Sequence, residues 1–117
     1  MRVLVCGGRE FGDKLLLYKT LNELARAEQI DCIIEGDARG ADRMAGWWAR
    51  SNRIDNLRFP VTAALDGPWP MAGPRRNQRM LDESKPDLCI AFPGGNGTAD
   101  MVRRCEAAGV KVVKVDS

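Results

Sequence analysis

The stretch Asp87-Leu88-Cys89-Ile90-Ala91-Phe92-Pro93-Gly94-Gly95-Asn96-Gly97-Thr98 predicts the fold of this chain. Residues 87–92 form its most apolar run, and the lack of alternation between polar and apolar positions indicates a strand buried on both faces. The glycine-rich turn then leads into a helical pattern that begins at Thr98 and ends near Gly109, a residue suited to the position after a helix. A buried strand, a glycine turn and a helix in this order are typical of a parallel α/β sheet.

The same unit recurs along the whole chain. The apolar runs that predict strands are 2–6, 31–35, 57–62, 87–92 and 110–115. The helical patterns fit about 13–28, 41–51, from 74 onward, and 98–109, with a loop rich in proline and glycine at 63–73. This alternation predicts a single domain over residues 1–117. Its expected architecture is a three-layer, Rossmann-like α/β open sandwich, with about five mostly parallel strands and helices on both faces.

The composition restricts the class of protein. The chain has 117 residues, a formal net charge of +2 and no histidine. The lack of histidine argues against a Ser–His relay, and we predict no metal site. The four cysteines have no CxxC spacing, so we interpret them as buried reduced thiols. Because no apolar run is long enough to span a membrane and the first residues do not resemble a signal peptide, we expect a cytoplasmic protein without membrane contact.

Glycines and arginines gather in the loops that follow strands. Ten of the twelve glycines lie there: Gly7, Gly8, Gly12, Gly36, Gly40, Gly67, Gly73, Gly94, Gly95 and Gly97. Such loops meet at the carboxyl edge of a parallel sheet, where ligands bind. Glycine lets backbone N–H groups approach an anion, and the following helix adds the positive end of its dipole. The guanidinium groups of Arg9, Arg39, Arg75 and Arg76 match phosphate oxygens. The sequence therefore predicts a site for a phosphorylated ligand.

Two familiar nucleotide motifs are absent. Residues 7–12 depart from the G-x-G-x-x-G fingerprint of dinucleotide-binding folds. At P-loop distance from Gly7, Asp13-Lys14 stands where a Walker motif has lysine followed by serine or threonine. The predicted phosphate site therefore follows neither the dinucleotide fingerprint nor the Walker motif.

Four linked motifs resemble the SLOG superfamily of Rossmann-like proteins. Pro93-Gly94-Gly95-Asn96-Gly97-Thr98 is similar to its P-G-G-x-G-T signature. The other three, similar in order and spacing to the small YspA/YpsA-type branch, are Gly7-Gly8-Arg9-Glu10-Phe11, Gly36-Asp37-Ala38-Arg39-Gly40-Ala41-Asp42-Arg43 and Ala72-Gly73-Pro74-Arg75-Arg76-Asn77-Gln78-Arg79-Met80. The superfamily also includes DNA-processing protein A/Smf proteins and phosphoribohydrolases. The resemblance implies a nucleotide or nucleotide-derived ligand, of an NAD- or ADP-ribose-like kind, held against the P-G-G-x-G-T turn.

The resemblance leaves catalysis open. In the phosphoribohydrolases an arginine before the fourth strand and a glutamate three residues after the signature threonine carry N-glycosidic cleavage. Arg76 matches that arginine, but the glutamate position is Met101. Asp100, one residue earlier, would point about 100° away around a helix. Arg76 and Asp100 are thus the candidate catalytic residues of an enzyme alternative that Met101 argues against.

We predict that the carboxyl-edge loops bind a nucleotide or a nucleotide-derived phosphorylated ligand, in a sensor or sequestering protein. The predicted ligand-binding residues are Gly7, Gly8, Arg9, Phe11, Arg39, Gly40, Asp42, Arg75, Arg76, Asn77, Pro93, Gly94, Gly95, Asn96, Gly97 and Thr98. The alternative is a hydrolase that splits a nucleotide N-glycosidic or phosphate bond. Binding of single-stranded DNA is disfavoured by the small net charge. A homodimer or higher oligomer is expected only by analogy with relatives.

For several side chains the sequence allows more than one interpretation. Asp42 fits either the first turn of a helix or the site itself, and Glu35 either a ribose-binding acid or an exposed strand end. Trp69, on the proline-rich loop, would stack on a base, fill the loop or contact a partner. We expect Trp48 in the core, whereas Trp47 beside it is placed at the helix edge and would suit a partner subunit.

Overall fold

The computed structural model describes residues 1–116. Its strands are β1 (Arg2–Cys6), β2 (Cys32–Glu35), β3 (Asp55–Arg58), β4 (Leu88–Ala91) and β5 (Lys111–Lys114). Its helices are α1 (Lys14–Ala27), α2 (Ala41–Ser51), α3 (Ala63–Asp66), α4 (Ala72–Ser84) and α5 (Asn96–Ala107). Within the described residues, the five strands form one sheet in the order β3-β2-β1-β4-β5, and every pairing is parallel. The predicted Rossmann-like α/β fold is confirmed.

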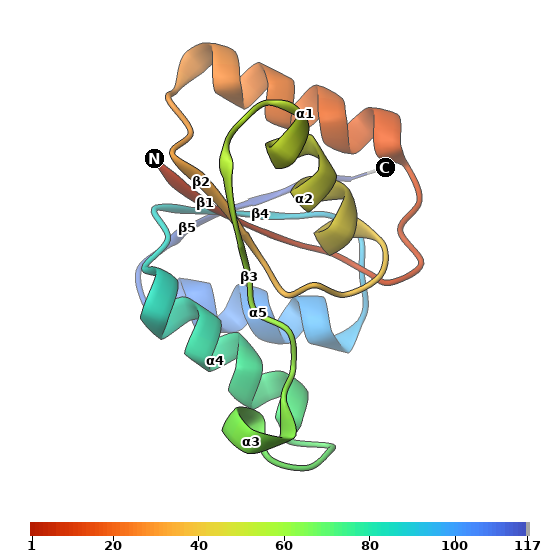
Figure 1. Cartoon of the computed structure of the whole chain (residues 1–117), viewed down its shortest axis with the longest axis vertical. Helices are drawn as coiled ribbons and strands as arrows, with labels where there is room; N and C mark the ends of the chain where they lie inside the picture. The colour runs from red at the N-terminus through yellow and green to blue at the C-terminus, as the bar shows by residue number, and fades with distance from the viewer. Residues whose placement is uncertain (117) are drawn as a thin grey trace.

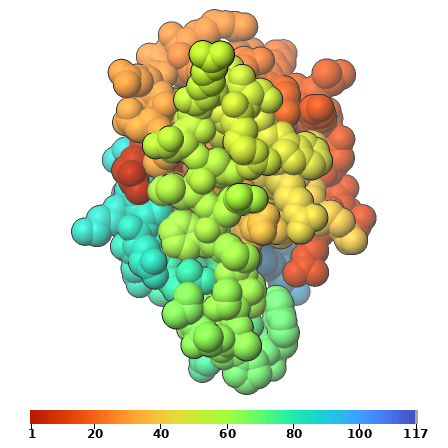
Figure 2. Space-filling view, viewed as in Figure 1, coloured from red at the N-terminus to blue at the C-terminus, as the bar shows by residue number. Residues whose placement is uncertain are grey.

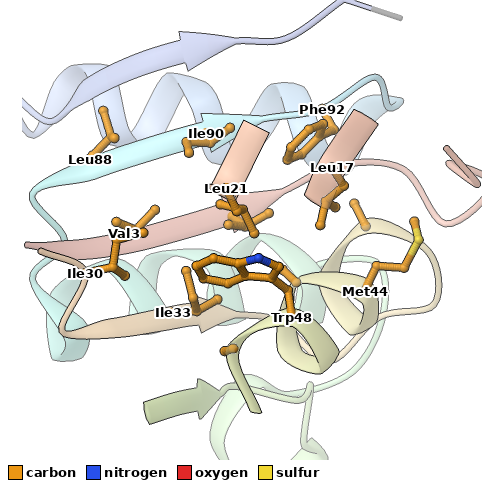
Figure 3. Packing of buried hydrophobic residues seen from close by; sticks show 14 residues of the cluster. Val3, Leu17, Leu21, Ile30, Ile33, Met44, Trp48, Leu88, Ile90 and Phe92 are labelled. Atoms are coloured by element: carbon orange, nitrogen blue, oxygen red, sulfur yellow. The ribbon is translucent and has the colours of Figure 1, made fainter. Parts of the chain in front are cut away.

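Helices cover both faces of the sheet, α1 and α2 on one side and α4 and α5 on the other (Figure 1). On the first side Trp48 packs among Val3, Leu21 and Ile33 (Figure 3). The indole is 1% exposed, and its Nε1 donates a hydrogen bond to Asn22 Oδ1 at 2.8 Å. Trp48 is therefore a core residue, as the sequence predicts.

The core on the second side is rich in sulfur-containing side chains. Cys6, Cys89 and Cys105 lie here with Met80 and Met101, and all of them are buried. The four cysteines of the chain are free and buried, in agreement with the interpretation as thiols. All four residues of β4 are buried, which confirms the strand predicted to be covered on both faces.

Four elements, β3, α3, α4 and α5, differ most from the prediction. β3 begins at Asp55 and ends at Arg58, because Pro60 has no N–H group to continue the ladder after Phe59 N donates to Glu35 O at 2.8 Å. The predicted loop 63–73 contains the short helix α3, capped by Thr62 Oγ1, which accepts from Leu65 N at 3.2 Å. α4 and α5 each begin two residues earlier than predicted.

The chain around α3 forms a lobe at the lower end of the molecule (Figures 1 and 2). It packs against the start of α4 rather than against the sheet. Gly109, with a φ of +78°, follows the end of α5 as predicted. Among residues 1–116, no helix combines the length and the apolar character that crossing a bilayer requires.

The core on the α1 side gives a direct test of the packing. Leu21→Ala, at a fully buried position, should lower the free energy of unfolding by about 2–5 kcal/mol. Leu15→Ala on the same helix, at a position 84% exposed, should change it by no more than about 0.5 kcal/mol. Urea unfolding followed by circular dichroism measures both, and equal losses would contradict the assignment of the buried face.

Candidate ligand-binding site

A cavity of about 810 Å³ opens at the carboxyl edge of the sheet, between the loop after β1 and the starts of α2, α4 and α5. Its size falls within the range of roughly 300–1,000 Å³ that small-molecule sites occupy. Of the predicted site residues, those that line it are Gly7, Gly8, Arg9, Asp42, Arg76, Asn77, Gly95, Asn96, Gly97, Thr98 and Asp100. Segments far apart in the sequence therefore meet here, as the parallel topology requires.

The three helices that start at this cavity have no side-chain cap. The N-cap residues of α2, α4 and α5 are Gly40, Met71 and Gly95, and none of them makes a capping bond. By contrast, Asp13 and Thr62 cap α1 and α3, whose starts do not line the cavity. At α5 the uncapped start leaves the N–H groups of Asn96, Gly97 and Thr98 as donors at the positive end of the helix dipole. At α2, by contrast, Ala41 N and Arg43 N already donate to Gly8 O at 3.4 Å and to Ala38 O at 3.3 Å. The cavity wall is thus suited to an anion.

The strand-end loops touch one another through their glycines. Gly8 N donates to Pro93 O at 2.9 Å, and a Cβ at Gly94 would collide with Thr98 Oγ1 and lie 2.7 Å from Gly8 N. Gly40 has a φ of +84°, and a Cβ there would collide with Gly8 O. These glycines are required by loop-to-loop packing. This packing is a reason for glycine at these positions in addition to the ligand approach that the sequence predicts.

Arg76 braces the cavity wall from α4. Its Nη1 donates to Gly36 O at 2.6 Å and to Phe59 O at 3.1 Å, and its Nε donates to Asn77 Oδ1 at 3.1 Å. The guanidinium thereby joins the chain after β2 and the chain after β3 to α4. Burial lowers the pKa of Arg76, but an arginine remains charged in a protein. The wall therefore carries a fixed positive charge.

Two of the carboxyl groups that line the cavity, Asp42 and Asp100, have pKa values shifted in opposite directions. Asp42 is buried, and its Oδ2 accepts from Ala38 N at 3.2 Å. Burial raises the pKa of Asp42 to about 6. Partial burial disfavours the charged form of Asp100 as well. Hydrogen bonds from Arg104 Nε at 2.8 Å and from Asn77 Nδ2 at 2.9 Å nevertheless hold its pKa below the usual range. Asp42 belongs both to the first turn of α2 and to the site.

Six predicted ligand-binding residues lie outside the lining of this cavity: Phe11, Arg39, Gly40, Arg75, Pro93 and Gly94. Phe11 packs against Phe92, with ring centroids 5.3 Å apart. Arg39 pairs with Glu10 at 2.6 Å on the surface. Pro93 and Gly94 line shallower hollows on the other side of their loop. The sequence placed all six residues at the sheet edge without indicating whether each one faces the cavity.

Residues that were not among the predicted site residues also line the cavity. Arg103 lines it from α5, and Trp69, Pro70, Gly73 and Pro74 line it from the α3–α4 loop and the start of α4. Helical spacing would have revealed Arg103, because Asn96, Asp100 and Arg103 are separated by four and three residues and share one face of the helix.

A family model described as the YspA, cpYpsA-related SLOG family matches residues 1–64. The Gene 61 protein of Mycobacterium phage D29 is 36% identical over 120 residues, which cover 96% of this chain and 94% of that protein. The chain belongs to the YspA- and cpYpsA-related SLOG family. This membership confirms the resemblance inferred from the four glycine-containing motifs.

Two solved structures share the fold of this SLOG protein. One is UDP-GlcNAc 2-epimerase from Neisseria meningitidis bound to UDP-GlcNAc, with a TM-score of 0.58 and 17% identity. The other is DNA processing protein A (DprA) from Streptococcus pneumoniae, with a TM-score of 0.54 and 18% identity. The matches cover 98% and 96% of this chain, but 32% of the epimerase and 58% of DprA. At these identities the likeness concerns the fold.

Glu35 of this SLOG protein turns away from the cavity. It is 1% exposed, faces α2, and accepts hydrogen bonds from Asn56 Nδ2 at 3.1 Å and from Asp37 N at 2.5 Å. A smaller hollow lined also by Arg43, Trp47, Arg50 and Arg58 lies beside it. Both interpretations of Glu35 from the sequence, a ribose-binding acid or an exposed strand end, are therefore wrong. Burial raises its pKa to about 7.

The Glu35 carboxyl should make stability depend on pH. Its pKa is about 7 in the folded chain against an ordinary 4.5, so the native state binds the proton more tightly and stability falls as pH rises through this window. Glu35→Gln removes the effect. We expect the unfolding free energy of the variant, relative to the wild type, to increase by about 2 kcal/mol between pH 5 and pH 8.

Urea titrations at the two pH values measure this difference. Asp55→Asn, an exposed carboxyl on the neighbouring strand, is the matched control and should follow the wild type. If the unfolding free energy of Glu35→Gln differs from that of the wild type by the same amount at both pH values, the raised pKa of Glu35 is contradicted.

Proposed function

We propose that this protein binds a nucleotide or a nucleotide-derived phosphorylated ligand in the carboxyl-edge cavity, in a sensor or sequestering role. The observation that carries the proposal is the convergence of three uncapped helix starts on one cavity. Each start offers the positive end of a helix dipole, worth about 0.3–1 kcal/mol of attraction for an anion, and the start of α5 adds N–H donors that have no partner among the described residues. The other two helices are capped by their own side chains and start elsewhere.

The start of α5 is the favoured position for the phosphate. At Gly95 and Gly97, no other group lies within 4 Å of where a Cβ would be, so the backbone there is open to a ligand. Arg9 and Arg103 line the same cavity and supply guanidinium groups. Charge-assisted hydrogen bonds contribute about 1.5–3 kcal/mol each. Two of them and the helix starts provide most of the roughly 8 kcal/mol of micromolar affinity.

A small ligand suits the cavity better than a nucleic acid strand. The net charge is only +2, and strand binding depends on neutralising many phosphates. Exposed arginines near the site also have acidic partners, as Arg39 has in Glu10. Among the fold neighbours, the epimerase structure contains the nucleotide sugar UDP-GlcNAc, a ligand of the proposed class.

Titration calorimetry with AMP, ADP-ribose, NAD and cyclic AMP tests the proposal. At least one of these ligands should bind the wild type. Arg9→Ala should then weaken binding roughly tenfold or more, since a charge-assisted bond to phosphate is lost. Arg26→Ala, on α1 and outside the cavity, is the control and should bind as the wild type does. Absence of binding by all four ligands to the folded protein would refute the proposal.

A second candidate function is hydrolysis of the nucleotide, and the state of Asp42 favours it. This carboxyl lies in the cavity near Arg76, and its pKa of about 6 is close to that of an effective general base. Asp100, the carboxyl considered from the sequence, is held by Arg104 and Asn77. Met101 is buried at the position that the resemblance gives to a catalytic glutamate.

Turnover is measured as release of free base or of phosphate from a bound nucleotide. If Asp42 acts as a base, the rate should rise with pH through about 6, because only the ionised carboxyl accepts a proton. Asp42→Asn should then reduce the rate by about 100-fold or more while leaving binding measurable. Tight binding without any product would exclude the hydrolase and leave the binding function.

A further inference from the structure

Trp69 is an exposed aromatic side chain at the rim of the proposed ligand cavity. Its indole is 62% exposed, although it lines the cavity. The six-membered ring rests on the first turn of α4 at Gly73, where a Cβ would lie 3.2 Å from Trp69 Cζ3. The ring is therefore seated at one edge while most of its surface faces water. Of the other tryptophans, Trp48 is in the core and Trp47 lies outside this cavity.

The lining of the cavity has an uncharged part around Trp69 and positively charged groups elsewhere. Around Trp69 its wall consists of Pro70, Gly73 and Pro74, which carry no charge. Arg9, Arg103 and the uncapped start of α5 supply the positive groups elsewhere in the same cavity. A ligand that satisfies both parts has an anionic group and a flat apolar group.

The loop that carries Trp69 is anchored before any ligand binds. Asp66 is 1% exposed and accepts two hydrogen bonds at 3.0 Å from Arg79 of α4, one from Nε and one from Nη2. Its Oδ2 also accepts from Thr62 N at 2.8 Å. A bidentate pair of this kind fixes orientation as well as position. The loop is thus held at its start, three residues before Trp69, and a ligand has less conformational freedom to restrict on binding.

We propose that Trp69 stacks on the base of the nucleotide whose phosphate lies at the start of α5. This inference rests on the proposed binding function and specifies its ligand as a phosphate that carries a nucleobase, as opposed to a sugar phosphate. Loss of one stacking contact costs about 1–3 kcal/mol, which corresponds to a five-fold to more than hundred-fold loss of affinity.

The test compares AMP, ADP-ribose and ribose 5-phosphate by calorimetry and by tryptophan fluorescence. AMP or ADP-ribose should bind at least about five-fold more tightly than ribose 5-phosphate and should quench the emission of Trp69. Trp69→Ala should remove the preference and the quenching together. Trp69→Phe keeps a ring for stacking and should retain most of the affinity without the quenching. Trp47→Phe, which changes the other exposed tryptophan, should retain both.

The outcomes separate this inference from the function on which it rests. If ribose 5-phosphate binds as tightly as AMP, or if Trp69→Ala binds AMP as the wild type does, stacking is refuted while the phosphate site stands. If the folded wild type binds none of the three probes and also binds neither NAD nor cyclic AMP, the binding function fails and the stacking with it. Circular dichroism of each variant verifies that the exposed substitution leaves the fold intact.

Discussion

The backbone contact between the loops after β1 and β4 determines the geometry of the sheet edge. Gly8 N donates to Pro93 O, and the space between the loops is so small that a methyl group at Gly94 would lie 2.7 Å from Gly8 N. Gly40, at the start of α2, approaches Gly8 O just as closely. Three strand ends are thereby fixed relative to one another. The starts of α2 and α5 consequently border the same cavity, so that the positive ends of both helix dipoles lie there, although Ala41 N of α2 is itself used by Gly8 O.

The two faces of the sheet differ in what their helices contribute. On one face α1 and α2 enclose a large apolar core around Trp48 (Figure 3). On the other face α4 supplies Arg76, whose hydrogen bonds to Gly36 O and Phe59 O connect the chain beyond β2 and β3 to the cavity wall. Helix α2 contributes to both the Trp48 core and the cavity, and both depend on the same parallel strands.

Much of this arrangement could be predicted from the sequence because its signals are local. Apolar runs and helical periodicity gave the order of the elements, and the rule that strand-end loops meet at one edge gave the approximate place of the site. Side-chain direction could not be obtained in this way. Phe11 turned out to pack against Phe92, and Glu35 is buried on the α2 side, because each depends on residues distant in the chain. The helix α3 was missed because four residues capped by Thr62 give almost no periodic signal.

The lobe around α3 has a consequence for how such a protein diversifies. It carries Trp69, packs on α4 and takes little part in the two apolar cores. Its attachment depends mainly on the pairing of Asp66 with Arg79 and not on the sheet. At the proposed site, replacement of residues 67–71 between α3 and α4 would therefore alter ligand selectivity with little cost in folding free energy. The proposed site thus combines an anion-binding base with an exchangeable selectivity segment, an architecture in which related chains would acquire different ligands by changing a single loop.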